Sequence, residues 1–249
     1  MEKPCQYKFA NQRTAKAIQV HGFVELPEAL SNLDIHHRHP TLVIVGGASG
    51  IGEVDKTRLK QLFIEEIAPL VQELGVAVVD GGTDAGIMQF MGQARTQIGG
   101  TFPLIGVVAI GTAMLPNTPP PSTEAAHLEP NHTHFILVPG TNWGDESPWI
   151  SRVASELSKG FPSLTIVVNG GEITFQDVSN SLRENRPIVT LEGTGRTADQ
   201  LAAALRGEAA DSRAQKFAAS GKMQAINSLK QPARLTEVIK EILSKLLSL

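Results

Sequence analysis

Glycine-rich segments follow the short apolar runs of this chain, and they are the part of the sequence most suited to chemistry. Residues 46–52 follow one apolar run, residues 80–86 follow the next, and residues 192–196 follow the last. Glycine lets a ligand approach the backbone closely, and the first amide N–H groups of a following helix, with the helix dipole, favour a negative charge. Such segments bind phosphate groups. We therefore expect a site for a phosphate-bearing ligand.

Six apolar runs alternate with helical patterns and position these segments. The runs are residues 41–45, 76–79, 104–109, 134–138, 164–168 and 187–191. Apolar runs without polar alternation are typical of parallel strands that are covered on both faces. The pattern predicts an α/β fold, a Rossmann-like, doubly wound, mainly parallel sheet of about six to seven strands with helices on both faces. Because parallel strands end at the same edge of a sheet, the glycine segments should converge there.

The regular alternation predicts one domain after a short leading segment. Residues 1–40 are mixed and polar and are interpreted as an N-terminal arm, in which residues 17–24 form an edge strand. Residues 41–249 are predicted to form one Rossmann-like domain that carries the ligand site, and its last helix, residues 232–247, has an apolar face for the sheet or for another subunit. The proline-rich segment 112–130 leaves the carboxyl end of a strand, and it is expected to be a lid over the site or a passive surface loop.

Composition and charge narrow the range of partners. The chain has 249 residues and a formal net charge of −3, which gives no long-range attraction to nucleic acid or to an anionic membrane. Cys5 is the single cysteine, so an intramolecular disulfide and a cysteine-based metal site are excluded. The sequence has no signal peptide and no apolar stretch of bilayer length. We expect a cytoplasmic protein whose partner is a small molecule, with a homo-oligomer of the chain as a further candidate.

The first glycine segment lacks two familiar nucleotide motifs. Residues 46–52 (GGASGIG) do not have the Gly-Lys-Ser/Thr ending of a P-loop, so no magnesium-assisted grip on a γ-phosphate is expected. They also do not form a clean dinucleotide fingerprint, which argues against a standard NAD-dependent dehydrogenase. His36, His37 and His39 lie in a polar segment without a carboxylate cluster and are interpreted as a solvated turn. We expect no metal and no required cofactor.

Three separated motifs resemble the SLOG superfamily. They read GGTDAGIM at residues 81–88 with Gly92 and Ala94 following, PNHTHFILV at residues 130–138, and VTLEGTGRTAD at residues 189–199. The chain is most similar to the LSDAT type, that is, to the cytosolic N-terminal domain of melastatin-type transient receptor potential channels and its free-standing prokaryotic relatives. The resemblance covers residues 41–205 in matching order. It extends more distantly to the lysine-decarboxylase-like (LOG) phosphoribohydrolases and to the DNA-processing protein DprA.

The resemblance implies a site for NAD-derived molecules such as ADP-ribose or cyclic ADP-ribose. It implies that one wall of the site is formed by Gly81, Gly82, Thr83, Gly86 and Met88. It also implies that the phosphate-facing turn is formed by Gly193, Thr194, Gly195 and Arg196. The phosphoribohydrolases carry a Pro-Gly-Gly-x-Gly-Thr-x-x-Glu loop, whereas residues 139–146 read PGTNWGDE. This departure, together with the lack of a recognisable upstream arginine motif, argues against hydrolysis.

The other candidates follow from residue type. Glu146 begins a predicted helix, where it either complements the helix dipole or faces a ribose, and it is the catalytic candidate if the protein is an enzyme. We expect Glu192 to accept from ribose hydroxyls and His132 to contact the ligand at the mouth of the site. Trp143 either stacks on an adenine or is buried against the helix. The remaining predicted ligand-binding residues are Gly46, Gly47, Ser49, Gly111, Gly140, Thr141 and Gly144.

Three functions are compatible with these residues. The first is a ligand-binding protein that senses or sequesters a phosphate-bearing, NAD-derived nucleotide without chemistry of its own. The second is a hydrolase of the N-glycosidic bond of a nucleotide or of NAD, with Glu146 as the key carboxylate. The third is an assembly protein that oligomerises through its C-terminal helix. We favour binding, because no general acid/base set is recognisable and the full set of glycine segments argues against a vestigial site.

Overall fold

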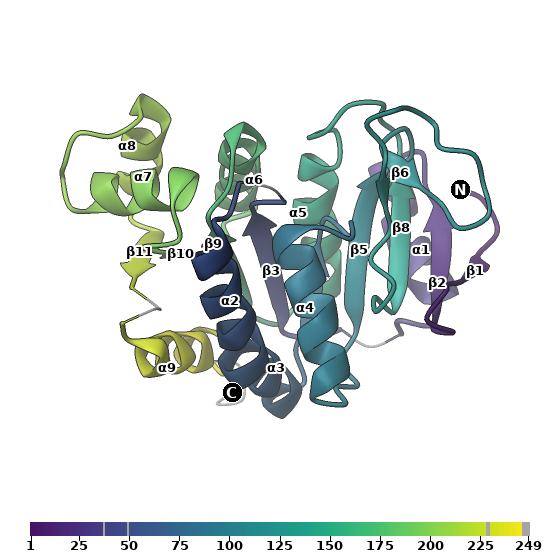
Figure 1. The fold of residues 1–249 in the computed structure, drawn as a ribbon, viewed down its shortest axis with the longest axis horizontal. Helices are drawn as coiled ribbons and strands as arrows, with labels where there is room; N and C mark the ends of the chain where they lie inside the picture. Colours follow the sequence, from purple (N-terminus) through teal and green to yellow (C-terminus); the bar gives the residue numbers. More distant parts are fainter. Residues whose placement is uncertain (37, 49, 228–229, 246–249) are drawn as a thin grey trace.

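A mainly parallel sheet runs through the computed structural model, which describes residues 1–36, 38–48, 50–227 and 230–245 (Figure 1). In these residues it has nine strands in the order β1-β2-β8-β5-β4-β3-β9-β10-β11, of which only β1 and β2 pair antiparallel. The bounds are β1 Cys5–Lys8, β2 Thr14–Gln19, β3 Thr41–Gly46, β4 Ala77–Asp80, β5 Leu104–Ala109, β8 His134–Val138, β9 Ser163–Val168, β10 Ile188–Leu191 and β11 Met223–Ile226.

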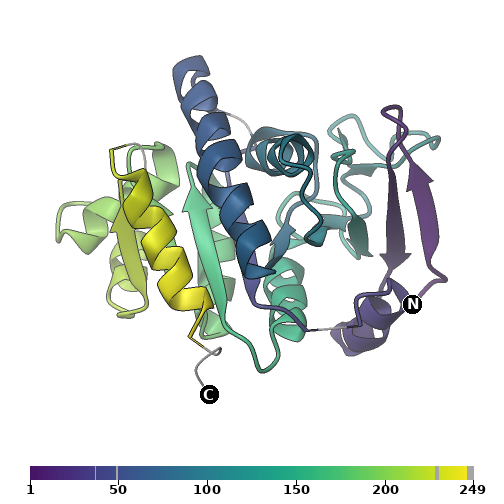
Figure 2. The same cartoon turned by 90° about the horizontal axis from the view of Figure 1, so that it is seen from below.

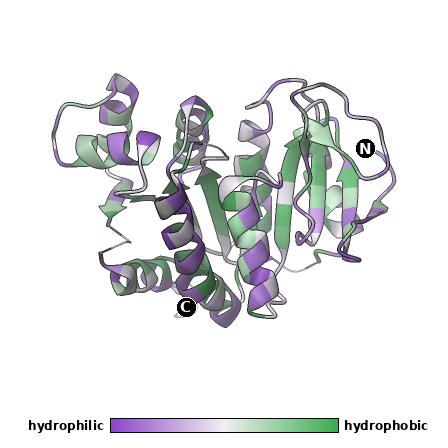
Figure 3. Ribbon diagram, viewed as in Figure 1, coloured by the Kyte–Doolittle hydropathy of each residue, from purple (hydrophilic) through white to green (hydrophobic). Residues whose placement is uncertain are grey.

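The six predicted strands are confirmed as β3, β4, β5, β8, β9 and β10, and the α/β, doubly wound prediction is confirmed with them. Nearly all of their residues are buried, and their apolar character stands out in Figure 3. The sheet is larger than the predicted six to seven strands because β1, β2 and β11 extend its two sides. Strand β11 has four residues that are mostly only partly buried, so it leaves no continuous apolar run in the sequence.

The first 40 residues do not form the irregular arm predicted from the sequence. Strand β2 pairs in parallel with β8, so it is an inner strand, and β1 forms the edge of the sheet. The strand predicted at residues 17–24 starts and ends earlier, and it is followed by a short 3-10 helix, η1 Phe23–Glu25, and by α1, Leu26–Asn32. Ala17 and Leu26 are fully buried. This segment therefore belongs to the core of the fold.

Helices cover both faces of the sheet (Figure 2). One face carries α2 Glu53–Leu62, the π-helical turn η2 Phe63–Ile67, α3 Ala68–Leu74, α4 Gly86–Gln97 and α9 Pro232–Leu243. The other face carries α1, α5 Ser147–Leu157, α6 Glu172–Arg183, α7 Arg196–Leu205 and α8 Ser212–Ala218. The C-terminal helix α9 packs against β9 and α3, so its apolar face is covered by the sheet. Leu246 and Leu247 of the predicted helix lie outside the described residues.

The strand order reverses between β3 and β9. From β3 the chain continues through β4 and β5 to β8 on one side, and it then crosses to β9 and β10 on the other side. The helices that follow β3 and β9 lie on opposite faces of the sheet. The two loops at the carboxyl ends of β3 and β9 therefore part and leave a crevice, and such a switch point is where open α/β sheets bind ligands.

Candidate ligand-binding site

A cavity of about 300 Å³ opens at the switch point. Its walls come from the end of β3, from the loops that follow β3, β4, β8 and β9, and from the N-terminal turns of α4, α5, α6 and α7. The volume is at the lower end of the range for small-molecule pockets, about 300–1,000 Å³. It suits a group of mononucleotide size rather than a whole dinucleotide.

The cavity brings together part of the predicted site. Among the described residues, the predicted ones that line it are Gly46, Gly47, Gly81, Thr83, Met88, Glu146 and Arg196. Trp143 also lines it and is 40% exposed, so its ring is not buried against the helix. The lining residues that the sequence analysis did not select are Ile44, Val45, Ala48, Ile150, Gly171, Glu172, Ile173, Thr174 and Asp177. Ser49 lies outside the described residues.

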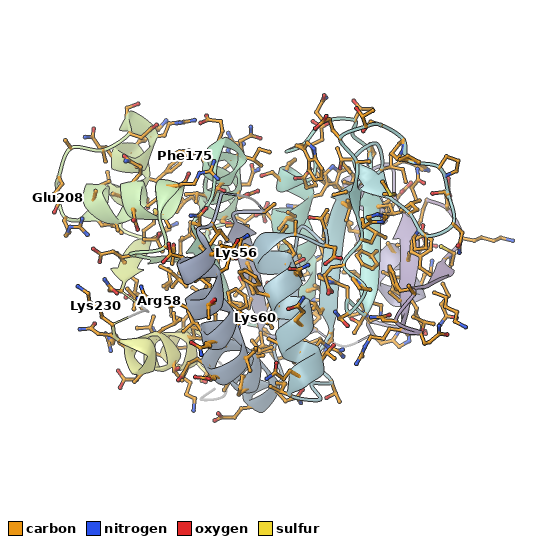
Figure 4. All side chains as sticks on the ribbon, viewed as in Figure 1. Lys56, Arg58, Lys60, Phe175, Glu208 and Lys230 are labelled. Carbon is orange, nitrogen blue, oxygen red and sulfur yellow. The ribbon has the colours of Figure 1, made fainter. Side chains whose placement is uncertain are left out.

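The first turn of α6 faces the cavity. Gly171 precedes the helix, and its N–H donates to the Thr174 hydroxyl at 3.2 Å. Phe175 packs in the opposite direction, toward α8 (Figure 4), where the Arg213 guanidinium carbon lies 4.0 Å from the centre of its ring. These contacts fix the rotation of α6 about its axis. Because α6 is 12 residues long, its N-terminus presents the positive end of a helix dipole to the cavity.

Arg196 crosses the rim of the cavity. It is the first residue of α7, it is exposed, and its guanidinium lies beside two glycines. A Cβ atom on Gly50 would meet Nη1 at 3.0 Å, and a Cβ atom on Gly171 would meet Nη2 at 2.8 Å. The two glycines therefore leave room for the guanidinium between the loops that follow β3 and β9. A guanidinium next to a helix N-terminus is a strong combination for binding phosphate.

Two neighbouring acids after β8 have different roles. The Asp145 carboxylate accepts from the N–H groups of Thr141 and Asn142 at 2.9 and 3.0 Å, and it thereby holds the loop. Glu146 lines the cavity, and its Oε2 accepts from the Gly144 N–H at 3.0 Å. Burial raises the pKa of Glu146, while hydrogen bonds from its own N–H and that of Gly144 lower it. Of the two, Glu146 is the acid placed to meet a ligand.

Asp177 is a cavity acid that the sequence analysis missed. It is 9% exposed, it lines the cavity, and its Oδ1 has no hydrogen-bond partner among the described residues. Burial raises the pKa of Asp177 to about 7; a hydrogen bond with Ser147 lowers it, and the negative charge of Glu146 raises it further. Near neutral pH the two cavity acids therefore hold a proton that isolated carboxyls would have lost. The helical spacing of the residues after the glycine segment at residues 169–171 could have placed Asp177 near the end of β9. No sequence motif, however, indicated that α6 borders the site.

Several predicted glycines serve the backbone instead of a ligand. A Cβ atom on Gly82 would meet the Cα of Gly106 at 2.7 Å, and one on Gly86 would meet the carbonyl oxygen of Gly47 at 2.0 Å. These positions allow adjacent segments to approach closely. Among the described residues, the predicted site residues that do not line the cavity are Gly82, Gly86, Gly111, His132, Gly140, Thr141, Gly144, Glu192, Gly193, Thr194 and Gly195.

The turn after β10 is closed by its own contacts. The buried Thr194 hydroxyl donates to the Leu191 carbonyl at 2.7 Å and accepts from the Asn169 N–H at 2.8 Å. The Glu192 carboxylate accepts from the Arg206 guanidinium at 2.6 Å. The Thr194 hydroxyl is therefore buried and occupied by partners within the fold, contrary to its predicted phosphate role, whereas the predicted ribose role of Glu192, which does not line the cavity, stays a prediction. Among the described residues of this turn, the arginine at the start of α7 is the one that reaches the cavity.

His132 is enclosed in the protein rather than placed at the mouth of the site. Its side chain is fully buried, with Nε2 2.9 Å from Asp80 Oδ1 and Nδ1 2.8 Å from Glu129 Oε2. Burial by itself lowers the pKa of His132, but the charges and hydrogen bonds of the two carboxylates outweigh it and raise the pKa to about 10. His132 is therefore a protonated bridge between the end of β4 and the loop before β8. Asp80 is 52 residues away in sequence, so no local pattern indicated this pairing.

The proline-rich segment 112–130 is not a lid over the cavity. It contains two short paired strands, β6 Ala113–Met114 and β7 Ala126–His127. Leu128 forms a bridge with Thr83 and packs in a cluster with Phe9. This segment contributes no described residue to the lining of the switch-point cavity. It covers the part of the sheet near the N-terminal strands.

Within the described ranges, no group of three or more His, Cys, Asp or Glu side chains is arranged to hold a metal ion. In the predicted solvated turn, His36 lies 3.4 Å from Asp34 and is exposed, whereas His37 is outside the described residues. No helix of the described part is long and apolar enough to cross a membrane.

The sheet order, the helices on both faces and the cavity at the switch point define a Rossmann-like α/β protein. Within this class, the chain belongs to the family described as "SLOG in TRPM, prokaryote", whose model matches residues 39–237. The resemblance that the three sequence motifs carry is thereby confirmed.

Relatives of known sequence include channel proteins. The chain is 28% identical over 206 residues to the transient receptor potential cation channel subfamily M member-like 2 of Nematostella vectensis. It is 29% identical over 200 residues to subfamily M member 2 of Mus musculus. The matches cover 67% and 66% of this chain but 13% of each relative. The chain thus corresponds to a small part of these proteins.

Solved structures share the fold at low sequence identity. The molybdenum cofactor binding protein of Rippkaea orientalis has a TM-score of 0.52 and 15% identity, and the match covers 81% of this chain and 98% of that one. The structural-genomics target TM1055 has a TM-score of 0.53 and 17% identity, with 80% and 99% covered.

Proposed function

We propose that this protein binds a phosphate-bearing nucleotide derivative in the switch-point cavity and thereby senses or sequesters it. We further propose that the ligand is NAD-derived, with ADP-ribose and cyclic ADP-ribose as the first candidates. The observation that carries the proposal is the convergence of the α6 N-terminus and the Arg196 guanidinium at the rim of one cavity. Family membership supports it, because the SLOG resemblance implies ligands of this class.

The proposed orientation of the ligand follows from the polarity of the cavity. The phosphate lies at the rim, where the arginine and the helix dipole attract an anion. The sugar lies deeper, next to Glu146, because a carboxylate accepts hydrogen bonds from hydroxyls but repels phosphate. The base lies against the half-exposed ring of Trp143. A larger ligand such as ADP-ribose extends past the rim, since the cavity itself holds a group of mononucleotide size.

Thermal unfolding with a nucleotide panel tests this proposal. AMP, ADP, NAD, ADP-ribose and cyclic ADP-ribose are added in turn, and at about 100 times its dissociation constant a true ligand stabilises the fold by about 2.7 kcal/mol. For a domain of this size the melting temperature then rises by about 5–10 °C. The proposal is abandoned if no member of the panel moves the midpoint.

A pair of arginine variants on α7 provides the control. Arg196→Ala removes the cation at the rim, so we expect about ten-fold weaker binding of the same ligand. Arg206→Ala removes an exposed arginine at the other end of the helix, which is paired with Glu192 and Glu208, and it should leave the affinity unchanged. Equal affinities of both variants would place the phosphate elsewhere.

N-glycosidic hydrolysis is a second candidate, and the position of Glu146 favours it. The carboxyl lies in the cavity beside Asp177, where it could stabilise positive charge at a sugar carbon. We nevertheless expect purified protein to release no adenine, nicotinamide or ribose phosphate from AMP, NAD or ADP-ribose over hours, as measured by chromatography. Release that the Glu146→Gln variant abolishes would establish hydrolysis instead, because that substitution removes the negative charge while keeping the shape of the side chain.

A further inference from the structure

One of the acids that line the cavity has an unpartnered carboxyl oxygen. Asp177 is more than nine-tenths buried, and its Oδ1 has no hydrogen-bond partner among the described residues. Buried polar atoms are nearly always paired, because an unpaired one destabilises the fold. Because the Asp177 side chain lines the cavity, we expect a bound molecule to supply the hydrogen-bond partner that its carboxyl lacks.

The Asp177 carboxyl has polar neighbours on α5 and α6. Ser147, on the neighbouring helix α5, lowers the pKa of Asp177. The Ser147 hydroxyl oxygen also accepts from the Asn180 side-chain amide at 3.0 Å. Ser147 and Asn180 thus place polar groups near the Asp177 carboxyl, while its Oδ1 has no partner among the described residues.

The neighbouring acid determines which chemical group fits. Glu146 lines the same cavity and its charge acts on Asp177, so the pair retains a proton and presents both a donor and acceptors. A hydroxyl also donates and accepts, so it can pair both with a protonated carboxyl and with an ionised one. Two adjacent hydroxyls match the two carboxyls. A ribose phosphate carries such a pair together with its phosphate.

We propose that Asp177 is a specificity-determining residue that, together with Glu146, hydrogen-bonds the 2′- and 3′-hydroxyls of a ribose phosphate, so that the site selects ribonucleotides over deoxyribonucleotides. This inference rests on the proposed function and specifies its ligand. The phosphate end of the ligand meets Arg196 and the α6 N-terminus, and the diol end meets the two acids. The protein then recognises the sugar through Glu146, at the start of α5, and Asp177, on α6.

Calorimetric titration with AMP, 2′-deoxy-AMP and 3′-deoxy-AMP tests the inference on the unmodified protein. We expect AMP to bind about ten-fold or more tightly than either deoxy analogue, since each analogue leaves a buried carboxyl without its partner. Asp177→Asn and Asp177→Ala should weaken AMP binding and bring the three affinities together. Glu184→Gln, at the other end of α6, should retain the full preference for AMP.

The ligand-free variants separate a binding role from a structural one. Asp177→Asn removes a buried acid that lies beside another acid, so its melting temperature should equal or exceed that of the unmodified protein. Equal affinities of the unmodified protein for AMP and the deoxy analogues overturn the inference and leave the proposed function standing. Retained preference in both Asp177 variants also overturns it. Failure of every nucleotide, ADP-ribose included, to bind removes the proposed function and the inference together.

Discussion

Replacing His132 by alanine is expected to lower the free energy of unfolding by about 3–5 kcal/mol, since the substitution leaves two carboxylates buried without their cation. Asp80 and Glu129 are both fully enclosed next to the imidazole. For a domain of this size, the loss corresponds to a fall in melting temperature of about 6–20 °C. The control is His36→Ala, which removes an exposed histidine 3.4 Å from Asp34 and should cost less than about 1 kcal/mol.

The same histidine predicts how stability depends on pH. The folded pKa of His132 is raised to about 10, whereas an unfolded histidine titrates at about 6.5. A raised folded pKa means that the stabilisation is fully present below about pH 6.5 and is lost as the pH rises toward 10. Urea unfolding at several pH values should show the difference in stability between the unmodified protein and His132→Ala shrinking over this range, by at most about 1.4 kcal/mol per pH unit. A constant difference contradicts a protonated His132.

A second large effect is expected at Gly46, at the end of β3. Its φ of +149° is disfavoured for residues with a side chain, and a Cβ atom would lie 1.8 Å from the carbonyl oxygen of Val168 on β9. Gly46→Ala must therefore strain the backbone and push β3 and β9 apart at the floor of the cavity. We expect a loss of about 3 kcal/mol or more in unfolding free energy.

Gly75 provides the matched control for this substitution. It also has a positive φ, +61°, but a Cβ atom there has no neighbour within 4 Å. Gly75→Ala should cost about 1–2 kcal/mol, from backbone strain alone. Thermal unfolding of both variants measures the difference. Equal losses in the two variants would show that the close approach of β3 and β9 is not a constraint on the fold.

The two acids and the arginine give the cavity a polarity that glycine loops alone lack. A phosphate site built only from backbone amides accepts any phosphate ester. Here, cation and helix dipole lie at the rim, and a carboxyl pair lies deeper, beside α5 and α6. A ligand must therefore carry hydrogen-bonding groups at a fixed distance from its phosphate. This polarity favours a site that discriminates among nucleotides, rather than one that binds any anion.

The sequence by itself determined the six central strands and the helices between them. Strands such as residues 104–109 and 134–138 are buried on both faces, and this burial requires the continuous apolar runs that are visible in the sequence. The strand at residues 223–226 is short and half-buried and the strand at residues 5–8 is mostly exposed, so neither was recognised, and the strand at residues 14–19 was predicted with shifted bounds, at residues 17–24. The family motifs were equally visible, because they are local and keep their order along the chain.

The choice of loops for the site was decided by the tertiary structure alone. All glycine segments after parallel strands look alike in sequence, but the strand order places those after β3, β4, β8 and β9 around the cavity, while the segment after β10 contributes Arg196 alone. The turn after β10 lies one strand further out, and there the Thr194 hydroxyl hydrogen-bonds with Asn169 and Leu191. Asp177 enters the site because α6 follows β9 at the switch point. Strand order and helix rotation bring together side chains that are far apart in sequence. Neither strand order nor helix rotation can be inferred from a local sequence pattern.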